Sequence, residues 1–141
     1  MPQIFLAHSS EDKEYLDTIG DTFYGTDISI YIASRIMEPK PPLKKVVVAI
    51  ETSRALFALV TRNVANHRDT RDWVTFELGY AEAHSKSIFA WVAEGIEPLE
   101  VLKYLTTYQP FEDAEGPMAK RKAAREIARQ MYNIAVSQYS T

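Results

Sequence analysis

The chain has 141 residues, of which 46% are hydrophobic, and a formal net charge of −3. This length and apolar content predict one domain, spanning residues 1–141, and exclude a disordered chain. Cysteine is absent, which excludes disulfides, thiolate nucleophiles and cysteine-based metal sites.

The distribution of charge and of apolar residues bears on possible partners. The densest basic run, at 120–129, interleaves with alanines at helical spacing and indicates a solvated helix face, so we expect no nucleic-acid partner. The opening apolar run at 3–7 is too short for a signal peptide or a membrane span. We therefore expect a cytoplasmic protein without a membrane partner.

The first half of the chain alternates between short apolar runs and amphipathic ones. Ser9 and Asp12 form a capping-box pattern, which predicts that a helix begins there. In chain order, the expected elements are a strand at 4–7, a helix to about 23, a strand at 28–32, a proline-rich irregular segment at 33–42 and a helix at 44–53.

The second half continues the alternation. The apolar run at 55–60 is typical of a central parallel strand that is buried on both faces. It is followed by an expected polar loop at 61–70, a helix at 71–85, a strand at 87–92, a short helix at 97–105, a strand at 107–111 and a helix at 118–137.

Five strands alternating with helices indicate an α/β fold. We predict a flavodoxin-like, doubly wound, five-stranded parallel sheet of order 2-1-3-4-5 with helices on both faces. Ligands of such sheets bind beyond the carboxyl ends of the strands. Three loops would then surround one cleft, namely His8 to Glu11, Ala33 to Pro42 and Thr61 to Arg71.

Trp73 and Glu77 lie four positions apart and would share one face of a helix. Val74, Leu78 and Ala81 form a neighbouring apolar face that can serve the core. An aromatic ring beside a carboxyl group can stack a flat heterocycle, and it can raise the carboxyl pKa by desolvation. The alternative is a half-buried tryptophan beside a solvated glutamate, and spacing alone favours this alternative.

Other polar residues near the expected cleft have two interpretations each. Ser9 and Ser10 can cap a helix or bind a ligand phosphate. Arg35, Arg54 and Arg62 can be solvated or can pair with a pyrophosphate. The three histidines lack a metal-binding spacing and no glycine-rich phosphate loop is present, so we expect neither a metal site nor a conventional dinucleotide dehydrogenase or NTPase.

From residue 4 to about 111 the chain resembles a Toll/interleukin-1 receptor (TIR) domain of the bacterial and archaeal NAD-cleaving type. The run from Ile4 to Asp12 is similar to the opening FxSHSSED of such domains, and the run from Ile50 to Thr61 is similar to their segment leading into the third strand. The most specific similarity is Trp73 with Glu77, which matches the W-x-x-x-E helix of TIR enzymes.

The resemblance implies an activity. Glu77 would be the catalytic glutamate and would stabilise positive charge on the ribose as nicotinamide leaves NAD, giving ADP-ribose or a cyclic isomer. Trp73 would stack near the substrate, with His8, Ser9 and Ser10 bordering it. Arg35 and Arg62 complete the expected substrate-binding set. NAD would be the substrate, with no separate cofactor, and antiviral or immune-like signalling in prokaryotes would be the setting.

The segment from Ala33 to Pro42 corresponds to the BB loop, through which TIR domains contact one another, so self-association is expected. This loop lacks the usual Pro-Gly pair, and Ala33 stands where many members carry an acidic residue. Two alternatives to the NAD-cleaving enzyme remain open. One is a non-catalytic TIR–TIR interaction module, and the other is an enzyme like the nucleoside deoxyribosyltransferases.

Overall fold

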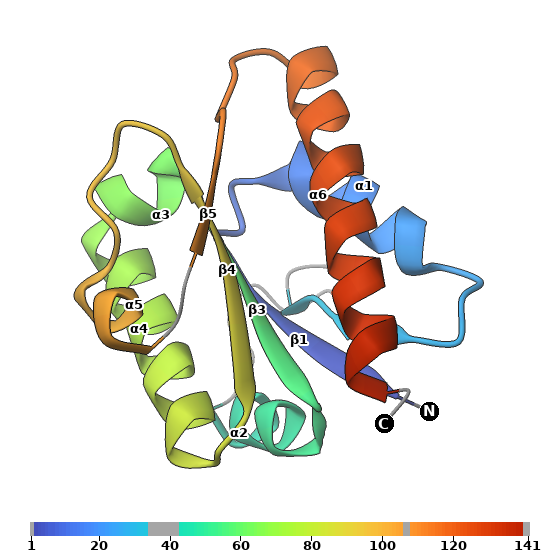
Figure 1. The fold of residues 1–141 in the computed structure, drawn as a ribbon. Coiled ribbons are helices and arrows are strands. Elements are labelled where there is room, and N and C mark those ends of the chain that lie inside the picture. The colour runs from blue at the N-terminus through green and yellow to red at the C-terminus, as the bar shows by residue number, and fades with distance from the viewer. Residues whose placement is uncertain (1, 34–42, 106–107, 140–141) are drawn as a thin grey trace.

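The computed structural model describes residues 2–33, 43–105 and 108–139 (Figure 1). Its centre is a parallel sheet of order β2-β1-β3-β4-β5, which confirms the predicted topology. The strands are β1 (Gln3–Ala7), β2 (Ser29–Tyr31), β3 (Ala55–Val60), β4 (Ser87–Ala93) and β5 (Tyr108–Phe111).

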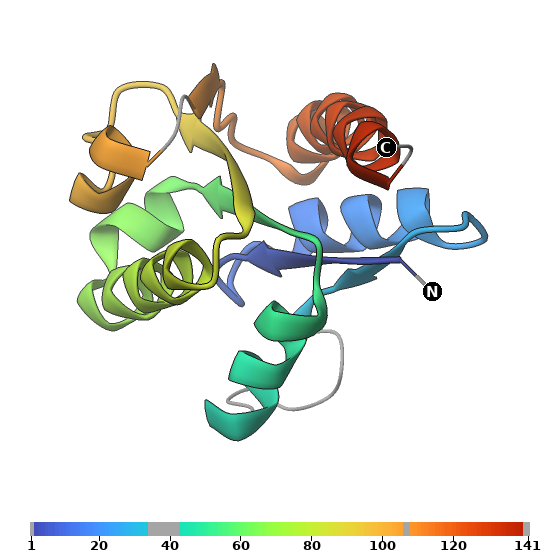
Figure 2. The ribbon, with the colours of Figure 1, turned by 60° about the horizontal axis from the view of Figure 1, so that its bottom comes forward.

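Helices cover both faces of the sheet, as predicted (Figure 2). One face is covered by α1 (Lys13–Phe23) and α6 (Pro117–Tyr139), which pack against each other. The other face is covered by α2 (Leu43–Thr52), α3 (Arg62–Asn66), α4 (Arg68–Ala83) and α5 (Glu100–Leu105).

Strand β3 divides its side chains between two cores. Every residue of β3 is buried, because side chains of a strand alternate between the faces and helices cover both. Ala55, Phe57 and Leu59 join the core under α1 and α6, whereas Leu56, Ala58 and Val60 join the core under α2 and α4. The continuous apolar run therefore arises from burial on two sides.

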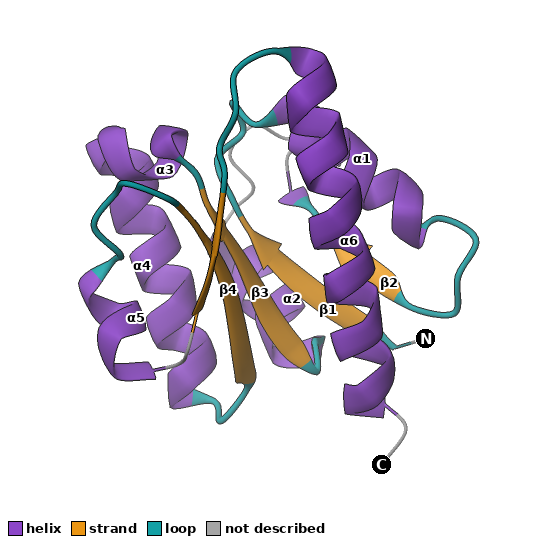
Figure 3. Cartoon of the chain, turned by 45° about the horizontal axis from the view of Figure 1, so that its top comes forward, coloured by secondary structure: helices purple, strands orange, loops and turns teal. Residues whose placement is uncertain are grey.

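The segment after β3 differs from the expectation. The predicted polar loop at 61–70 contains α3, and α4 begins at Arg68 (Figure 3). Thr61 is the N-cap of α3, and its hydroxyl accepts a hydrogen bond from the Val64 N–H at 3.4 Å. Because Val64 is fully buried, this short helix closes over the core although most of its other residues are polar.

The start of α1 also differs from the capping-box prediction. Asp12, not Ser9, is the N-cap residue, and its side chain makes no capping hydrogen bond. The Ser9 hydroxyl instead accepts a bond from the Glu11 N–H at 3.1 Å, inside the preceding turn. In α2, Val46 and Ile50 are buried as expected, but Ala49 completes the inner face and Val47 is only half-buried.

The last turn of α6 contacts the amino-terminal edge of the sheet. The Tyr139 hydroxyl donates to the Gln3 carbonyl and accepts from the N–H groups of Gln3 at 3.0 Å and Arg54 at 3.2 Å. The Arg54 guanidinium lies over the Tyr139 ring, 5.3 Å from its centre. Arg54 therefore lies at the edge opposite the expected cleft, because it precedes β3.

The expected BB loop and the possibility of a membrane-spanning helix remain to be compared with the structure. Arg35 and almost all of the expected BB loop, from residue 34 to residue 42, lie outside the described residues. Among the helices of the described parts, none combines the length and the apolar character needed to cross a bilayer.

Candidate functional site

The Trp73–Glu77 pair lies on α4, which connects β3 with β4 on the α2 side of the sheet. Val74, Leu78 and Ala81 are fully buried and hold α4 against the sheet, as the apolar spacing predicts. Glu77 borders this face and is only 4% exposed, whereas Trp73 is 38% exposed. The solvated-glutamate interpretation is therefore wrong, and Trp73 is more exposed than the half-buried side chain of that interpretation.

Burial dominates the electrostatics of Glu77. It raises the pKa of the carboxyl group to about 8, and a hydrogen bond from the Trp73 side chain acts in the opposite direction. Within the described parts of the chain no cation contributes to the shift. At pH 7 the Glu77 carboxyl group of the free protein is therefore mostly protonated. A positive charge bound beside it would favour the ionised form.

Aromatic rings continue along α4 from Trp73. The ring centres of Trp73 and Phe76 are 5.5 Å apart, those of Phe76 and Tyr80 are 6.0 Å apart, and Tyr80 stacks on His84 at 4.2 Å. Tyr80 also donates a hydrogen bond to Glu51 at the end of α2. Trp73 and Phe76 keep over a third of their surface exposed, so an exposed aromatic surface adjoins the buried acid.

The loop after β1 carries three of the expected substrate-binding residues. The His8 Nδ1 lies 2.8 Å from the Leu6 carbonyl, which only accepts, so Nδ1 carries the ring proton. Burial lowers the pKa of His8, so its ring is neutral at pH 7. Ser9 is buried within its turn, whereas Ser10 is exposed and is the freer of the two to meet a ligand.

Arg62 lies in a different group of residues. Its backbone N–H donates to the Asp113 carboxylate at 3.0 Å, and its guanidinium donates to the Asp113 carbonyl. The same carboxylate accepts from the Tyr15 hydroxyl at 2.8 Å and the Lys120 ammonium at 3.1 Å. These hydrogen bonds hold the pKa of Asp113 below its usual range against the opposing effect of burial. The Arg62 side chain thus joins a group that includes Tyr15 of α1 and Lys120 of α6, although α3 itself lies in the same helix layer as α4.

Asp12 is a buried carboxyl group that sequence reasoning missed. It is 2% exposed and accepts hydrogen bonds from the Thr61 hydroxyl and the Asn63 amide, both at 2.7 Å. Burial raises the pKa of Asp12, and these two bonds oppose the rise. The sequence signal for this group is weak, since it consists of a carboxylate in the loop after β1 and polar residues after β3. The capping-box interpretation assigned Asp12 a different role.

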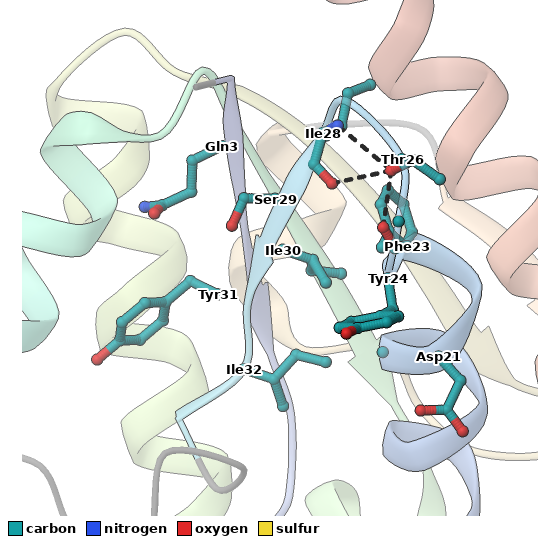
Figure 4. Close-up of a pocket in the computed structure, with 12 residues that line it drawn as sticks. Gln3, Asp21, Phe23, Tyr24, Thr26, Ile28, Ser29, Ile30, Tyr31 and Ile32 are labelled. Atoms are coloured by element: carbon teal, nitrogen blue, oxygen red, sulfur yellow. Dashed lines mark hydrogen bonds between the residues drawn. The ribbon is translucent and has the colours of Figure 1, made fainter.

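One groove of the described residues lies away from Glu77. It has a volume of about 700 Å³ and runs along edge strand β2 and the end of α1, with Asp21, Tyr24, Thr26 and Ile30 among its lining (Figure 4). Neither Trp73 nor Glu77 lines it. In the described parts of the chain, no three histidine, aspartate or glutamate side chains gather to hold a metal ion.

Comparisons with known proteins give a similarity at the level of the fold. No family model matches the chain, and no curated protein matches it. Among solved structures, the chain is similar to the CMP N-glycosidase BcmB of Clostridium botulinum, with a TM-score of 0.58 and 13% sequence identity. The match covers 92% of this chain and 98% of that one. At this identity the similarity supports the α/β fold.

Proposed function

We propose that this protein is an enzyme that hydrolyses the N-glycosidic bond of a nucleotide, with Glu77 as its catalytic carboxyl group. The observation that carries the proposal is the burial of Glu77 beside the half-exposed Trp73. A buried acid without a neighbouring cation costs stability, and such costs concentrate at functional sites.

The chemistry follows from the charge that the reaction develops. The bond between the ribose C1′ and the base nitrogen breaks, the base leaves with the bonding electrons, and the ribose becomes an oxocarbenium-like cation. Water adds to C1′ and releases a proton. The ionised Glu77 would stabilise this cation in a setting with little water, where a charge interaction is strongest. Trp73 would stack on the departing base.

Two lines of support point to different bases. The resemblance to TIR domains favours NAD, whose nicotinamide leaves as a neutral ring. The similarity to a CMP N-glycosidase favours a nucleoside monophosphate, and it agrees better with the deoxyribosyltransferase-like alternative. The two substrates share a ribosyl phosphate and the same bond, so one site accounts for either.

The test is an assay of both substrates at high protein concentration. We expect nicotinamide from NAD or cytosine from CMP, resolved by chromatography, and a loss of at least about 100-fold in kcat for Glu77→Gln. Glu82→Gln is the matched control, because Glu82 is an exposed glutamate on the same helix. Wild-type protein that releases neither base would overturn the proposal.

The second candidate is a module that acts by self-association. It rests on the resemblance and on the exposed aromatic rings of α4, since exposed apolar patches mark interaction surfaces. It predicts association that depends on Pro41 and Pro42 and that survives Glu77→Gln. Light scattering of these variants, alongside the substrate assay, separates the two candidates.

A further inference from the structure

Asp12 is a buried carboxyl group that the proposed reaction does not use. Each of its two oxygens accepts one side-chain hydrogen bond at 2.7 Å, from Thr61 and from Asn63. Hydrogen bonds to an ionised acceptor are stronger than neutral ones. A carboxylate that is 2% exposed and bonded at both oxygens holds its two partners in fixed positions.

The bond from Thr61 fixes the start of α3. The Val64 N–H can only donate, so the Thr61 hydroxyl accepts from it and gives its own proton to Asp12. The Thr61 carbonyl accepts from the N–H groups of Val64 at 3.1 Å and Ala65 at 3.0 Å. Asp12 therefore orients the residue that caps α3.

The bond from Asn63 leads to the start of α4. The Asn63 carbonyl lies 2.8 Å from the His67 Nδ1, and His67 is the residue between α3 and α4. The His67 carbonyl in turn accepts from the Arg71 N–H at 2.9 Å, in the first turn of α4. Trp73 and Glu77 follow in the next two turns, so the contacts form a continuous path from Asp12 to the site.

Asp12 also belongs to the loop after β1. Its N–H donates to the Ser9 carbonyl at 3.2 Å, and its own carbonyl accepts from the Leu16 N–H at 3.0 Å, within α1. The same residue thus closes the loop that carries His8, Ser9 and Ser10. The starts of α1 and α3 lie at the carboxyl-terminal edge of the sheet (Figure 3).

We infer that Asp12 is a positioning residue, which holds the α3–α4 segment, and with it Glu77, at a fixed place relative to the loop 8–11. This inference rests on the proposed function. Asp12 does not touch the substrate and acts through Thr61 and Asn63. A shift of about 1 Å in a catalytic group costs up to about 100-fold in rate, so such a link has a measurable effect.

An exchange of the two side chains tests the inference. Asp12→Asn removes the charge and makes the Asn63 amide turn so that its oxygen accepts from the new amide, and Asn63→Asp presents a carboxylate to a carboxylate. In Asp12→Asn/Asn63→Asp, the new asparagine donates to the new aspartate and still accepts from Thr61. We expect each single variant to lower kcat by about 10- to 100-fold with little change in KM, and the double variant to recover most of the loss.

A matched control separates positioning from a general loss of stability. Ala124→Gly weakens α6, which lies on the other face of the sheet from α3 and α4. We expect it to lower the melting temperature and to leave kcat unchanged. A double variant no more active than the single variants, or a loss of kcat in Ala124→Gly equal to theirs, would overturn the inference.

A second readout does not depend on activity. The Glu77 carboxyl carbon and the Trp73 indole N–H report their surroundings by NMR in wild type and in the same variants. We expect Asp12→Asn to move the Trp73 indole resonance and the Glu77 titration, and the exchange variant to restore both. If both stay unchanged in Asp12→Asn, the inference fails, whereas a protein inactive on both substrates with these shifts present rejects only the proposed function.

Discussion

Burial raises the pKa of the Glu77 carboxyl group, and the Trp73 side chain, one helical turn earlier on α4, acts in the opposite direction. This pair joins a buried acid to a half-exposed ring, and no charge of the described residues compensates the acid. The protein retains a costly group at one position. Three measurements test what that group and its surroundings do, and a fourth tests the contact of α6 with the sheet.

The first prediction concerns stability and pH. The pKa of Glu77 is about 8 in the folded protein against 4.5 for an unperturbed glutamate. The contribution of Glu77 to the free energy of unfolding is therefore fully present below pH 4.5. It is lost as the pH rises towards 8. Relative to wild type, Glu77→Gln should gain about 1.4 kcal/mol of unfolding free energy per pH unit across that window. Urea unfolding at several pH values measures this, and Glu82→Gln serves as the control. Parallel curves for wild type and Glu77→Gln would contradict the assignment.

The second prediction concerns the tryptophan. Trp73→Phe removes the hydrogen bond that favours the ionised acid, so the pKa of Glu77 should rise further above 8. Carbon-13 NMR titration of the glutamate side chains measures the change. Phe76→Leu is the control, because Phe76 is a neighbouring exposed ring whose side chain has no hydrogen-bond donor. A fall in the pKa after Trp73→Phe would show that the ring mainly desolvates the acid.

The third prediction concerns the pH profile of catalysis. If the ionised Glu77 stabilises the ribosyl cation, kcat/KM should rise about tenfold per pH unit below pH 8 and level off above it, since kcat/KM reports the free enzyme. The profile of kcat should lie at lower pH for NAD, because a bound cation favours the carboxylate. Activity that falls above pH 8 would instead identify Glu77 as a proton donor to the leaving base.

The fourth prediction concerns the contact of α6 with the sheet. Tyr139→Phe removes the donor to the Gln3 carbonyl and the acceptor of the Gln3 N–H, whereas the Arg54 N–H keeps its bond to the Gln3 carbonyl. The loss should be roughly 1–3 kcal/mol of unfolding free energy, measured by urea. Tyr104→Phe, at an exposed tyrosine, should cost almost nothing. Catalytic activity should be unchanged, because Tyr139 lies at the opposite edge of the sheet.

The fold could be predicted from the sequence, because the strongest sequence signals of its strands and helices are periodic. The buried run of β3 and the spacing of Val74, Leu78 and Ala81 reflect burial directly, and strand–helix alternation restricts the topology. The helix α3 was missed, because its stability comes from the Thr61 cap and from one buried valine rather than from an apolar face.

The candidate site could be predicted from the sequence only in part. Spacing placed Trp73 and Glu77 on one face, but the depth of Glu77 depends on how α4 packs beside α2 and the sheet, which spacing does not contain. The Asp12 contacts join residues about fifty positions apart, so no local pattern indicates them. Arg62 was expected beside the substrate, and its bonds to Asp113 arise from a β5–α6 turn that the sequence did not place.

The burial of Glu77 also has a calorimetric consequence. Below pH 8 the free protein carries a proton on this acid, and a cationic ligand that pairs with the carboxylate would displace it into the solution. Up to one proton per binding event would then pass to the buffer, so the measured heat of binding would vary with the ionisation enthalpy of the buffer chosen. A neutral ligand that accepts a hydrogen bond from the acid would leave that heat the same in every buffer.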